Sequence, residues 1–492
     1  MKKFVLAIDQ GTTSTRAILF DKKGKIHHQS QREIPCFYPR SGWVEQDALQ
    51  LWISVIDVVN EVMVKANITM QDIDSIGITN QRETTVVWDK KTGMPVYRAI
   101  VWQSRQSAMI CDNLSKHASF IQQKTGLLIN PYFSASKIRF ILDQIPHGQA
   151  RAEQGELLFG TVDSWLMYKM SKGKIHATDV SNASRTLLFN INELKWDKEL
   201  CRLFNIPLKM LPEVKPSSYI YGTASFFSKD VPIAGAAGDQ QAALFGQACF
   251  QKGESKNTYG TGCFMLLNIG DKPVFSKKGL LTTIAWQIDD KVTYALEGSV
   301  FIGGALVQWL RDEMEMIRTA SESEKMAVRA KDSNGIYIVP AFVGLGTPYW
   351  DDDARGAVFG LTRDSNNKQF IRACLEAIAY QCKDVIEIMK KESNVSVKTL
   401  KVDGGATENN YLLQFQSDIL STVIKVPNCL ETTAAGAAYL AGLKTGFFPS
   451  LEEIEKRQTY QRIYEPKMPK EEIKRRYKGW KQAVKATRMF KI

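Results

Sequence analysis

The amino-acid sequence predicts an α/β protein made of two duplicated domains that face each other across a central cleft. The chain has 492 residues, which is more than one hydrophobic core usually holds. Short apolar runs typical of buried strands alternate with segments that have the apolar spacing of helices. A strand, a tight turn of glycine and hydroxyl residues, and a second strand are predicted both at 4–20 and at 258–267. We therefore expect domains at 1–248 and 249–492, joined near 246–253.

Composition and cysteine usage are those of a soluble protein from a reducing compartment. The chain is 44% hydrophobic and 24% charged, and no apolar run approaches the roughly 18 residues of a membrane span. The apolar segment near the beginning of the sequence ends at Asp9, which favours a buried first strand over a secretory signal. The eight cysteines form no Cys-x-x-Cys pair and no zinc-type spacing with the five histidines. We expect free thiols and a cytoplasmic location.

The net charge of +12 is concentrated in the last part of the chain. Residues 456–492 contain thirteen Lys or Arg against three Glu. Such a tail could bind nucleic acid or acidic lipid. However, Ile473, Tyr477, Trp480 and Val484 recur at helical spacing. This favours an amphipathic helix packed on the body, so neither a nucleic-acid partner nor membrane insertion is expected.

The first strand, Phe4 to Ile8, leads into a turn that could hold phosphate. Gly11 permits a close approach, and Thr12, Thr13 and Ser14 offer amides and hydroxyls. Asp9, at the end of the strand, could reach a magnesium ion, although these residue types also make ordinary hairpins. The next strand is 17–20, and a turn follows at 21–24.

Polar and aromatic residues after the next elements indicate a small polyhydroxy ligand. A helix is predicted at 48–66 and a strand at 73–79. The strand is followed by Arg82 and Glu83, which offer donors and acceptors but could equally be a surface ion pair. Trp102 and Tyr132 would suit the wall of a site, although core packing is the more common use of such residues.

A carboxylate near the middle of the chain is the strongest catalytic candidate. Asp239 lies between an apolar run at 231–234 and a helical pattern at 242–250, next to Gly235 and Gly238. It could accept a proton from a hydroxyl or help to hold a metal, and the competing interpretation is a simple helix N-cap. Before it, 160–168 is predicted to pass from strand to helix, and 207–221 to be a loop.

The second half also contains glycines and polar residues beside predicted strands and helices. We expect a helix from Glu297 to Leu310 in which Gly304 and Gln308 share a face. A strand at 400–402 ends at Asp403, before two glycines and a helix through 419, an arrangement suited to nucleotide phosphates. A helix rich in small residues is predicted at 434–442.

Five short motifs, taken together, resemble the FGGY family of carbohydrate kinases, and within it the glycerol kinases. They are Asp-Gln-Gly-Thr-Thr at 9–13, Asn-Gln-Arg-Glu at 80–83, Gly-Asp-Gln-Gln at 238–241, Tyr-Gly-Thr-Gly-Cys-Phe at 259–264 and Asp-Gly-Gly-Ala at 403–406. The resemblance runs nearly the whole chain. It implies two ribonuclease H-like domains of the actin-like ATPase type. It also implies ATP-dependent phosphorylation of glycerol to sn-glycerol 3-phosphate in glycerol catabolism, with Mg²⁺, in a homodimer or homotetramer.

The resemblance also implies a role for each matching residue. Asp239 would be the general base, and Asp9 and Asp239 would lie near magnesium. The implied substrate residues are Arg82, Glu83, Trp102, Tyr132, Asp239, Gln240 and Phe264. The implied nucleotide residues are Thr12, Thr13, Ser14, Arg16, Thr261, Gly304, Gln308, Gly405 and Asn409.

Two alternatives remain at this point. One is a kinase of the same group that acts on a pentulose or a sugar acid. The other is a nucleotide-gated structural protein, such as an actin-like filament or a chaperone ATPase, which would need no acceptor pocket. The loop at 224–232 has neither the histidine nor the glycine- and arginine-rich run that regulate some bacterial relatives.

Overall fold

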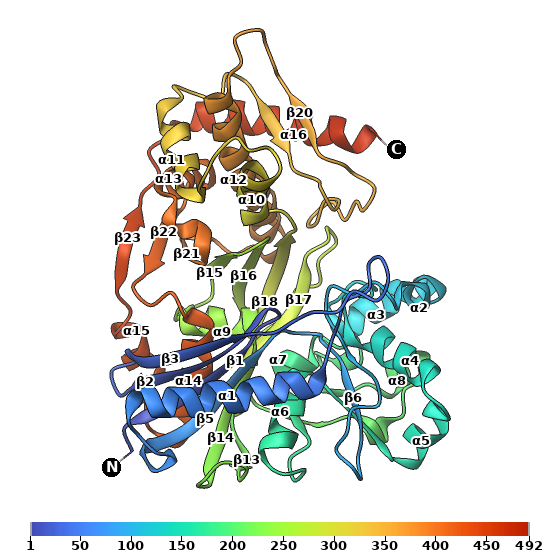
Figure 1. Cartoon of the computed structure of the whole chain (residues 1–492). Helices are drawn as coiled ribbons and strands as arrows, with labels where there is room; N and C mark the ends of the chain where they lie inside the picture. Colours follow the sequence, from blue (N-terminus) through green and yellow to red (C-terminus); the bar gives the residue numbers. More distant parts are fainter. Residues whose placement is uncertain (1, 491–492) are drawn as a thin grey trace.

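The computed structural model describes residues 2–490. Met1, Lys491 and Ile492, the outer ends of the two predicted domains and of the basic tail, lie outside the described residues. Within this range thirteen strands form one mixed sheet that runs through the molecule (Figure 1). Helices cover it on both sides, so the predicted α/β class is confirmed. No helix in the described part of the chain is long and apolar enough to cross a membrane.

The two halves contribute five-stranded units of the same topology. The first unit has the order β3-β2-β1-β5-β14, and the second has the order β18-β16-β15-β21-β22. In each unit the first two pairings are antiparallel and the last two parallel. The first-unit strands are β1 (Phe4–Gln10), β2 (Ser14–Asp21), β3 (Ile26–Glu33), β5 (Ile73–Asn80) and β14 (Val231–Gly238). The second-unit strands are β15 (Glu254–Tyr259), β16 (Cys263–Gly270), β18 (Lys291–Val300), β21 (Thr399–Asp403) and β22 (Val423–Pro427). The duplication predicted from two similar turns is therefore present in the fold.

The units are joined inside the same sheet. Strand β17 (Leu281–Ile288) borders the second unit and β13 (Ser218–Ala224) the first, and they meet where Ser218 pairs with Ile288. The strand β23 (Tyr460–Tyr464) extends the far edge. Strand β1 is buried at all seven positions, as expected for a strand covered on both faces. The proposed division at 248/249 falls between α9 (Asp239–Gly246) and β15.

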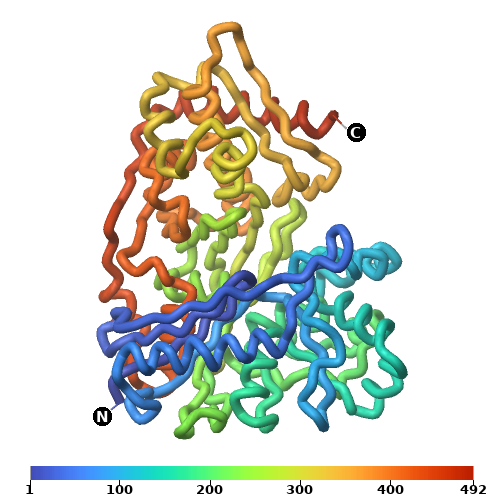
Figure 2. The backbone as a smooth tube through the Cα atoms, in the orientation of Figure 1, coloured from blue at the N-terminus to red at the C-terminus, as the bar shows by residue number. Residues whose placement is uncertain are grey.

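Two helices that follow equivalent strands cross at the centre of the molecule. Helix α9 follows β14, and α14 (Thr432–Thr445) follows β22. A Cβ added to Gly246 would lie 1.9 Å from the Thr432 carbonyl oxygen, and one added to Gly436 would lie 1.9 Å from that of Ala242. The backbones therefore touch. Helix α14 packs against β1, β5 and β14, and Figure 2 shows this late part of the chain returning beside the blue first strands.

The remaining elements surround this frame. A lobe beside the first unit (Figure 1, lower right) lies between β5 and β14 in sequence. It includes β6 (Val86–Asp89), β7 (Ala99–Ile100), α2 (Ala108–Asn113), α3 (Ala118–Thr125), α4 (Ser134–Gln144), α5 (Gly148–Gln154), β8 (Leu157–Gly160), α6 (Val162–Met170), α7 (Val180–Ala183) and α8 (Lys198–Leu203). Helices of the frame and of the second half are α1 (Ala48–Ala66), α10 (Gly304–Asp312), α11 (Ala320–Arg329), α12 (Asn367–Ser393), α13 (Asn410–Leu420), α15 (Leu451–Lys456) and α16 (Lys470–Met489).

The basic tail forms the predicted amphipathic helix. In α16, Ile473, Trp480 and Val484 are buried. The buried carboxylate of Asp384 on α12 accepts hydrogen bonds from the Tyr477 hydroxyl, at 2.5 Å, and from the Trp480 indole, at 2.8 Å. The apolar face is therefore packed on the second half, and the basic face points to solvent.

Two expected elements differ from the structure. Glu297 does not open a helix, because it lies in β18 and the helix begins only at Gly304. The pairing of this segment with β16 and β17 decides its structure, and local spacing does not report such pairing. The expected loop at 207–221 contains β12 (Glu213–Lys215), which pairs with β9 (Ala177–Asp179), and the start of β13.

Candidate active site

A small cavity lies where the predicted substrate residues meet. Its volume is about 70 Å³, well below the roughly 300–1,000 Å³ of sites for drug-sized ligands. The residues that line it are Thr12, Arg82, Glu83, Trp102, Tyr132, Asp239, Gln240 and Phe264. The structure therefore brings together all seven residues predicted to bind the substrate, with one threonine of the first phosphate turn.

The topology explains this convergence. Thr12 follows β1, Arg82 follows β5, and Asp239 follows β14, and these three strands run parallel. The carboxyl ends of parallel strands lie on one edge of a sheet, where open α/β sheets usually bind ligands. Phe264 reaches the same place from β16 in the second half. The cavity is thus built from both halves of the chain.

Asp239 is the first residue of α9, and it does not cap that helix. The residue in the capping position is Gly238, so the N-cap interpretation of Asp239 is wrong. Asp239 Oδ1 accepts the Gln240 N–H at 2.7 Å and lies 3.1 Å from Arg82 Nε. About a third of its side chain, 31%, is exposed. Within residues 2–490 both of these contacts fall on Oδ1, which leaves Oδ2 available to a hydroxyl group in the cavity.

Arg82 belongs to a buried network of charges. Its guanidinium donates to the two carboxylate oxygens of Glu297 at 2.5 and 3.1 Å. Arg185 donates to Glu297 at 3.0 Å and to Glu83 Oε1 at 2.6 Å. Burial alone would raise the pKa of Glu297, but Arg185 and Arg82 outweigh it and lower this pKa to about 2. Glu297 therefore stays ionised and fixes both arginines.

Glu83 is held in an unusual backbone conformation. Its φ of +60° lies in the left-handed region, which is costly for a residue with a side chain. Its carbonyl oxygen accepts from Thr85 Oγ1 at 3.0 Å, Ser134 Oγ at 3.2 Å and Lys137 Nζ at 3.3 Å. Burial raises the pKa of the Glu83 carboxyl, and Arg185 only partly offsets this. Three donors thus fix the backbone that presents Glu83 to the cavity.

Three aromatic rings form the less polar wall. The Trp102 ring contacts the Tyr132 ring edge-on, with centroids 5.6 Å apart. It contacts the Phe264 ring in the same way, with centroids 6.4 Å apart. The Trp102 indole donates to Thr12 Oγ1 at 2.9 Å, which links this wall to the first phosphate turn. Burial raises the pKa of the Tyr132 hydroxyl, so it remains a proton donor. This wall offers carbon contact and one hydroxyl group.

The predicted nucleotide residues lie on two turns, on β2, in α10 and before α13. The first turn, which holds Thr12, Thr13 and Ser14, is closed by a bond from Gly11 N–H to the Ser14 carbonyl at 2.9 Å. The second turn, with Thr261, accepts backbone bonds from the residues that open α10. Thr13 and Thr261 are exposed, as a phosphate contact requires.

The other predicted nucleotide residues differ in what they already contact. A Cβ on Gly405 would meet nothing within 4 Å, so its surface is open to a ligand, and Gln308 is exposed. A Cβ on Gly304 would lie 2.7 Å from the Gly260 carbonyl, which gives this glycine a packing role. Asn409 caps α13, because its side chain accepts the Leu412 N–H at 2.9 Å. Arg16 is paired with Glu431 at 2.7 Å.

The metal candidates are two carboxylates. Burial raises the pKa of Asp9 to about 7, Arg16 opposes this shift, and Asp239 and Glu431 add to it. The influence of Asp239 on Asp9 means that the two negative charges share one region, which a cation would stabilise. No group of three or more His, Cys, Asp or Glu that could hold a metal occurs in the described residues. Mg²⁺ typically uses one or two carboxylates together with water and phosphate oxygens.

Sequence reasoning missed Arg185, Glu297 and Lys137. All three are fully buried ionisable residues. A charged residue within a mostly apolar segment, such as Glu297 within 294–300, is a sequence signal of a buried charge that needs a partner. The helix expected from Glu297 needs no partner for this glutamate, whereas the strand found there buries it.

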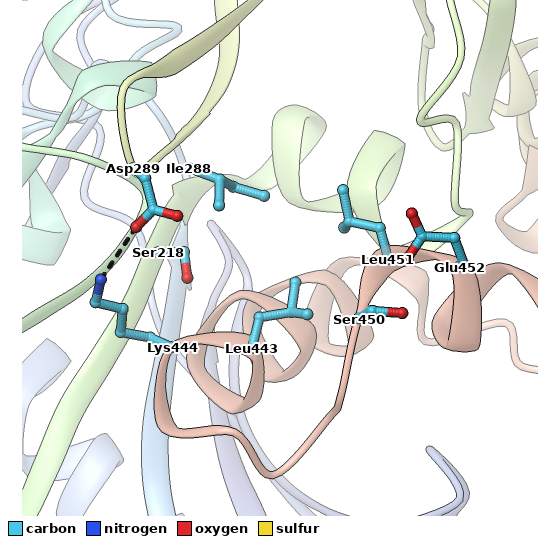
Figure 3. Close-up of a pocket in the computed structure, with 8 residues that line it drawn as sticks. All are labelled: Ser218, Ile288, Asp289, Leu443, Lys444, Ser450, Leu451 and Glu452. Carbon is cyan, nitrogen blue, oxygen red and sulfur yellow. Dashed lines mark hydrogen bonds and ion pairs between the residues drawn. The ribbon is translucent and has the colours of Figure 1, made fainter.

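A larger cavity of about 370 Å³ lies elsewhere and contains none of these residues (Figure 3). It is formed by the end of β17, the end of α14 and the start of α15. Asp289 and Lys444 form an ion pair of 3.2 Å at one side of it, and the apolar side chains of Ile288, Leu443 and Leu451 make up much of the rest.

Comparisons with known proteins agree with the site. Residues 4–246 match the N-terminal domain of the FGGY family of carbohydrate kinases, and residues 255–445 match its C-terminal domain. A protein of Bacillus licheniformis named glycerol kinase is 58% identical over 100% of both chains. The structure of Plasmodium falciparum glycerol kinase with ADP is 36% identical, covers 98% of both chains and superposes with a TM-score of 0.93. A gluconate kinase of Lactobacillus acidophilus, 20% identical over 99% of both chains with a TM-score of 0.90, shares the fold.

Proposed function

Because the chain belongs to the FGGY family of carbohydrate kinases, we propose that it transfers the γ-phosphoryl group of ATP to glycerol. The products are sn-glycerol 3-phosphate and ADP, and the place of the reaction is glycerol catabolism. The observation that carries the proposal is the small cavity in which Arg82, Glu83 and Asp239 face Trp102 and Phe264. The full-length relatives named glycerol kinase support the same substrate.

Each wall of the cavity has a role in holding glycerol. The guanidinium of Arg82 donates to a hydroxyl oxygen, and the carboxylates of Glu83 and Asp239 accept from hydroxyl hydrogens. Trp102 and Phe264 pack against the carbon chain. Tyr132 and Gln240, which also line the cavity, supply further polar contacts. A small volume with this many charged groups selects a short polyol over a sugar.

Asp239 acts as the general base. Its free carboxylate oxygen takes the proton of the attacking glycerol hydroxyl while the oxygen of that hydroxyl forms a bond to Pγ. The bond from Pγ to the bridging oxygen breaks, and ADP leaves with that electron pair. The hydrogen bonds to Oδ1 from Gln240 and Arg82 hold the carboxylate in place. Such a step depends mainly on position and charge, which this rigid network provides.

The nucleotide binds against the turns of both halves. Thr12, Thr13 and Ser14 contact phosphate oxygens from one side and Thr261 from the other. Gly405 offers open backbone surface to the nucleotide, with Gly304, Gln308 and Asn409 around it. Arg16 turns from Glu431 to the phosphates when ATP is present. Asp9 and Asp239 would lie near Mg²⁺, since carboxylate oxygens are ligands of the type it prefers. When bound, this ion neutralises phosphate charge.

We further propose a cytoplasmic protein that forms a homodimer or homotetramer. The eight cysteines, all within the described residues, are free thiols, which suits a reducing compartment. The chain divides at 248/249 into an N-terminal domain that binds glycerol and a C-terminal domain that binds the nucleotide. Light scattering of the purified protein determines its mass in solution.

The two alternative functions, a sugar kinase and a structural ATPase, place different demands on the acceptor cavity. A pentulose or sugar-acid kinase needs a larger acceptor cavity than about 70 Å³, and the similarity to a gluconate kinase extends only to the fold. A filament or chaperone ATPase needs no cavity lined by an arginine, two carboxylates and three aromatic rings.

The test is coupled ADP release with Mg-ATP and five conditions: glycerol, xylulose, ribulose, gluconate and no acceptor. The proposal predicts strong stimulation by glycerol alone. Stimulation by a sugar instead would keep the kinase and overturn the substrate. ADP release that ignores every acceptor would favour the structural class.

A further inference from the structure

Lys256 is a buried cation that the reaction described above does not use. It lies on β15, an interior strand of the sheet between β21 and β16, and its side chain has no exposed surface. Its Nζ donates to Gln240 Oε1 and, at 2.9 Å, to Thr258 Oγ1. Both partners are neutral oxygen atoms. No carboxylate of the described residues lies within 4.0 Å of this nitrogen.

The neighbouring strand shows how this chain treats a buried lysine with a structural role. Lys401 on β21 is the register partner of Lys256 and is almost as deeply buried. Its Nζ pairs with Glu254 at 3.0 Å and with the carbonyl oxygens of Gln247 and Ala248 at 3.0 and 2.8 Å. All three of its N–H donors therefore have a partner, one of them charged. An unpaired buried ammonium is costly, so Lys256 requires another explanation.

The position of Lys256 supplies that explanation. Gln240, on one side, lines the glycerol cavity and is bonded through its N–H to Asp239. Thr258, on the other side, is paired with Phe264 and stands just before the second phosphate turn at 260–262. In the proposed reaction a phosphoryl group moves from a nucleotide on this turn to a hydroxyl beside Asp239, and Lys256 contacts one residue next to each of these two places. An ammonium has three donors, and these two bonds use only two.

We propose that Lys256 is a catalytic residue whose third N–H bonds an oxygen of the phosphoryl group during its transfer. This inference rests on the proposed function. Lys256 keeps its protons throughout, while the bond from Pγ to the glycerol oxygen forms and the bond from Pγ to ADP breaks. Its charge offsets the negative charge of the phosphoryl oxygens, and the low dielectric strengthens this effect. Burial lowers the pKa of Lys256 to about 8, with Asp403 and Asp239 opposing, so it is still largely a cation at neutral pH.

The first test compares Lys256→Gln with Lys401→Gln. Glutamine can still bond Thr258 but has no charge. Removal of one such donor costs on the order of 10²–10³ in kcat, and we expect this loss for Lys256→Gln with the glycerol Kd, measured by calorimetry, changed less than about threefold. Lys401→Gln, which removes a charge that is almost as deeply buried, should keep kcat within about threefold of wild type.

An alternative role for Lys256 is to hold Gln240 in place. In that case Lys256→Gln and Gln240→Leu would raise the glycerol KM by the same factor and leave kcat unchanged, and this result would overturn the inference. Wild-type turnover with glycerol tests the proposed function independently. If the wild type is active and Lys256→Gln equals it, only the Lys256 proposal fails.

A second measurement needs no variant and covers the case in which Lys256→Gln does not fold. A crystal structure of the wild type with glycerol, ADP, Mg²⁺ and aluminium fluoride mimics the transferred group. We expect Lys256 Nζ at about 2.7–2.9 Å from a fluoride, the length of a charge-assisted hydrogen bond. A Lys256 that still contacts only Gln240 and Thr258 in this complex would contradict the proposal.

Discussion

Arg82, which follows a strand of the first half, and Glu297, on a strand of the second half, are joined by two buried hydrogen bonds of 2.5 and 3.1 Å. The same arginine lies 3.1 Å from the carboxylate of Asp239. One side chain therefore connects the proposed base to the opposite half of the molecule. The acceptor cavity depends on this contact, because Arg82 also forms part of its wall.

Glu297→Gln should weaken both glycerol binding and the fold. Loss of one partner from a buried ion pair typically costs about 3–5 kcal/mol, because the other charge stays buried. We expect the glycerol KM to rise by about tenfold or more and the thermal midpoint to fall. Glu471→Gln is the matched control, since its pair with Lys474 is exposed and worth at most about 1 kcal/mol. An unchanged KM in Glu297→Gln would contradict the role of this contact.

The sequence was sufficient to predict the residues at strand ends and insufficient for those that reach the site from elsewhere. Asp239 and Arg82 stand in short motifs directly after strands that the sequence pattern reveals. Because these strands are parallel neighbours, their carboxyl ends bring the two residues together. Glu297 and Arg185 reach the site from β18 and from the segment after α7, and their contacts with Arg82 and Glu83 are tertiary. The helix wrongly expected to begin at Glu297 has the same cause, since cross-strand pairing overrode local preference.

Lys137 should give stability a specific pH dependence. Its Nζ donates to the carbonyl oxygens of Tyr132, at 2.5 Å, and of Glu83, and burial lowers its pKa to about 7. The unfolded chain keeps this proton up to about pH 10.4. Between these values the unfolded state binds more protons, so the Lys137 contribution to the unfolding free energy rises with pH.

Lys137→Met removes this contribution. We expect the thermal midpoint of wild type to exceed that of Lys137→Met by more at pH 9 than at pH 6.5, since charging the buried amine penalises only the wild type at the lower pH. Differential scanning fluorimetry in matched buffers measures both. A gap between the two proteins that is constant with pH would mean that Lys137 does not titrate in this range.

The crossing of α9 and α14 should not tolerate a methyl group. Gly436→Ala would place Cβ 1.9 Å from the Ala242 carbonyl, so the helices must separate. We expect a large fall in the thermal midpoint and a loss of activity, because α9 begins with Asp239. Gly446→Ala at the end of α14 is the control, because a Cβ there would meet no atom within 4 Å. Its only cost is that of an alanine in the left-handed conformation, about 1–2 kcal/mol. Equal effects of the two substitutions would refute the packing argument.

Substrates should close the cleft between the two halves. The phosphate turns at 11–14 and 260–262 belong to different halves, and a nucleotide held by both draws them together while excluding water. The tight α9–α14 crossing is the natural pivot. We expect the radius of gyration from small-angle X-ray scattering to decrease when glycerol and a non-hydrolysable ATP analogue are both added. Identical scattering with and without them would count against closure.

The most direct test of the account is the glycerol-dependent release of ADP by wild type and by Asp239→Asn. Asparagine can still accept the hydrogen bonds of Gln240 and Arg82, but it cannot take a proton. We predict that kcat falls by about 10²–10⁴, the usual contribution of a general base, while glycerol binding changes little. If Asp239→Asn turns over glycerol at a rate close to that of wild type, Asp239 is not the base and the proposed mechanism is wrong.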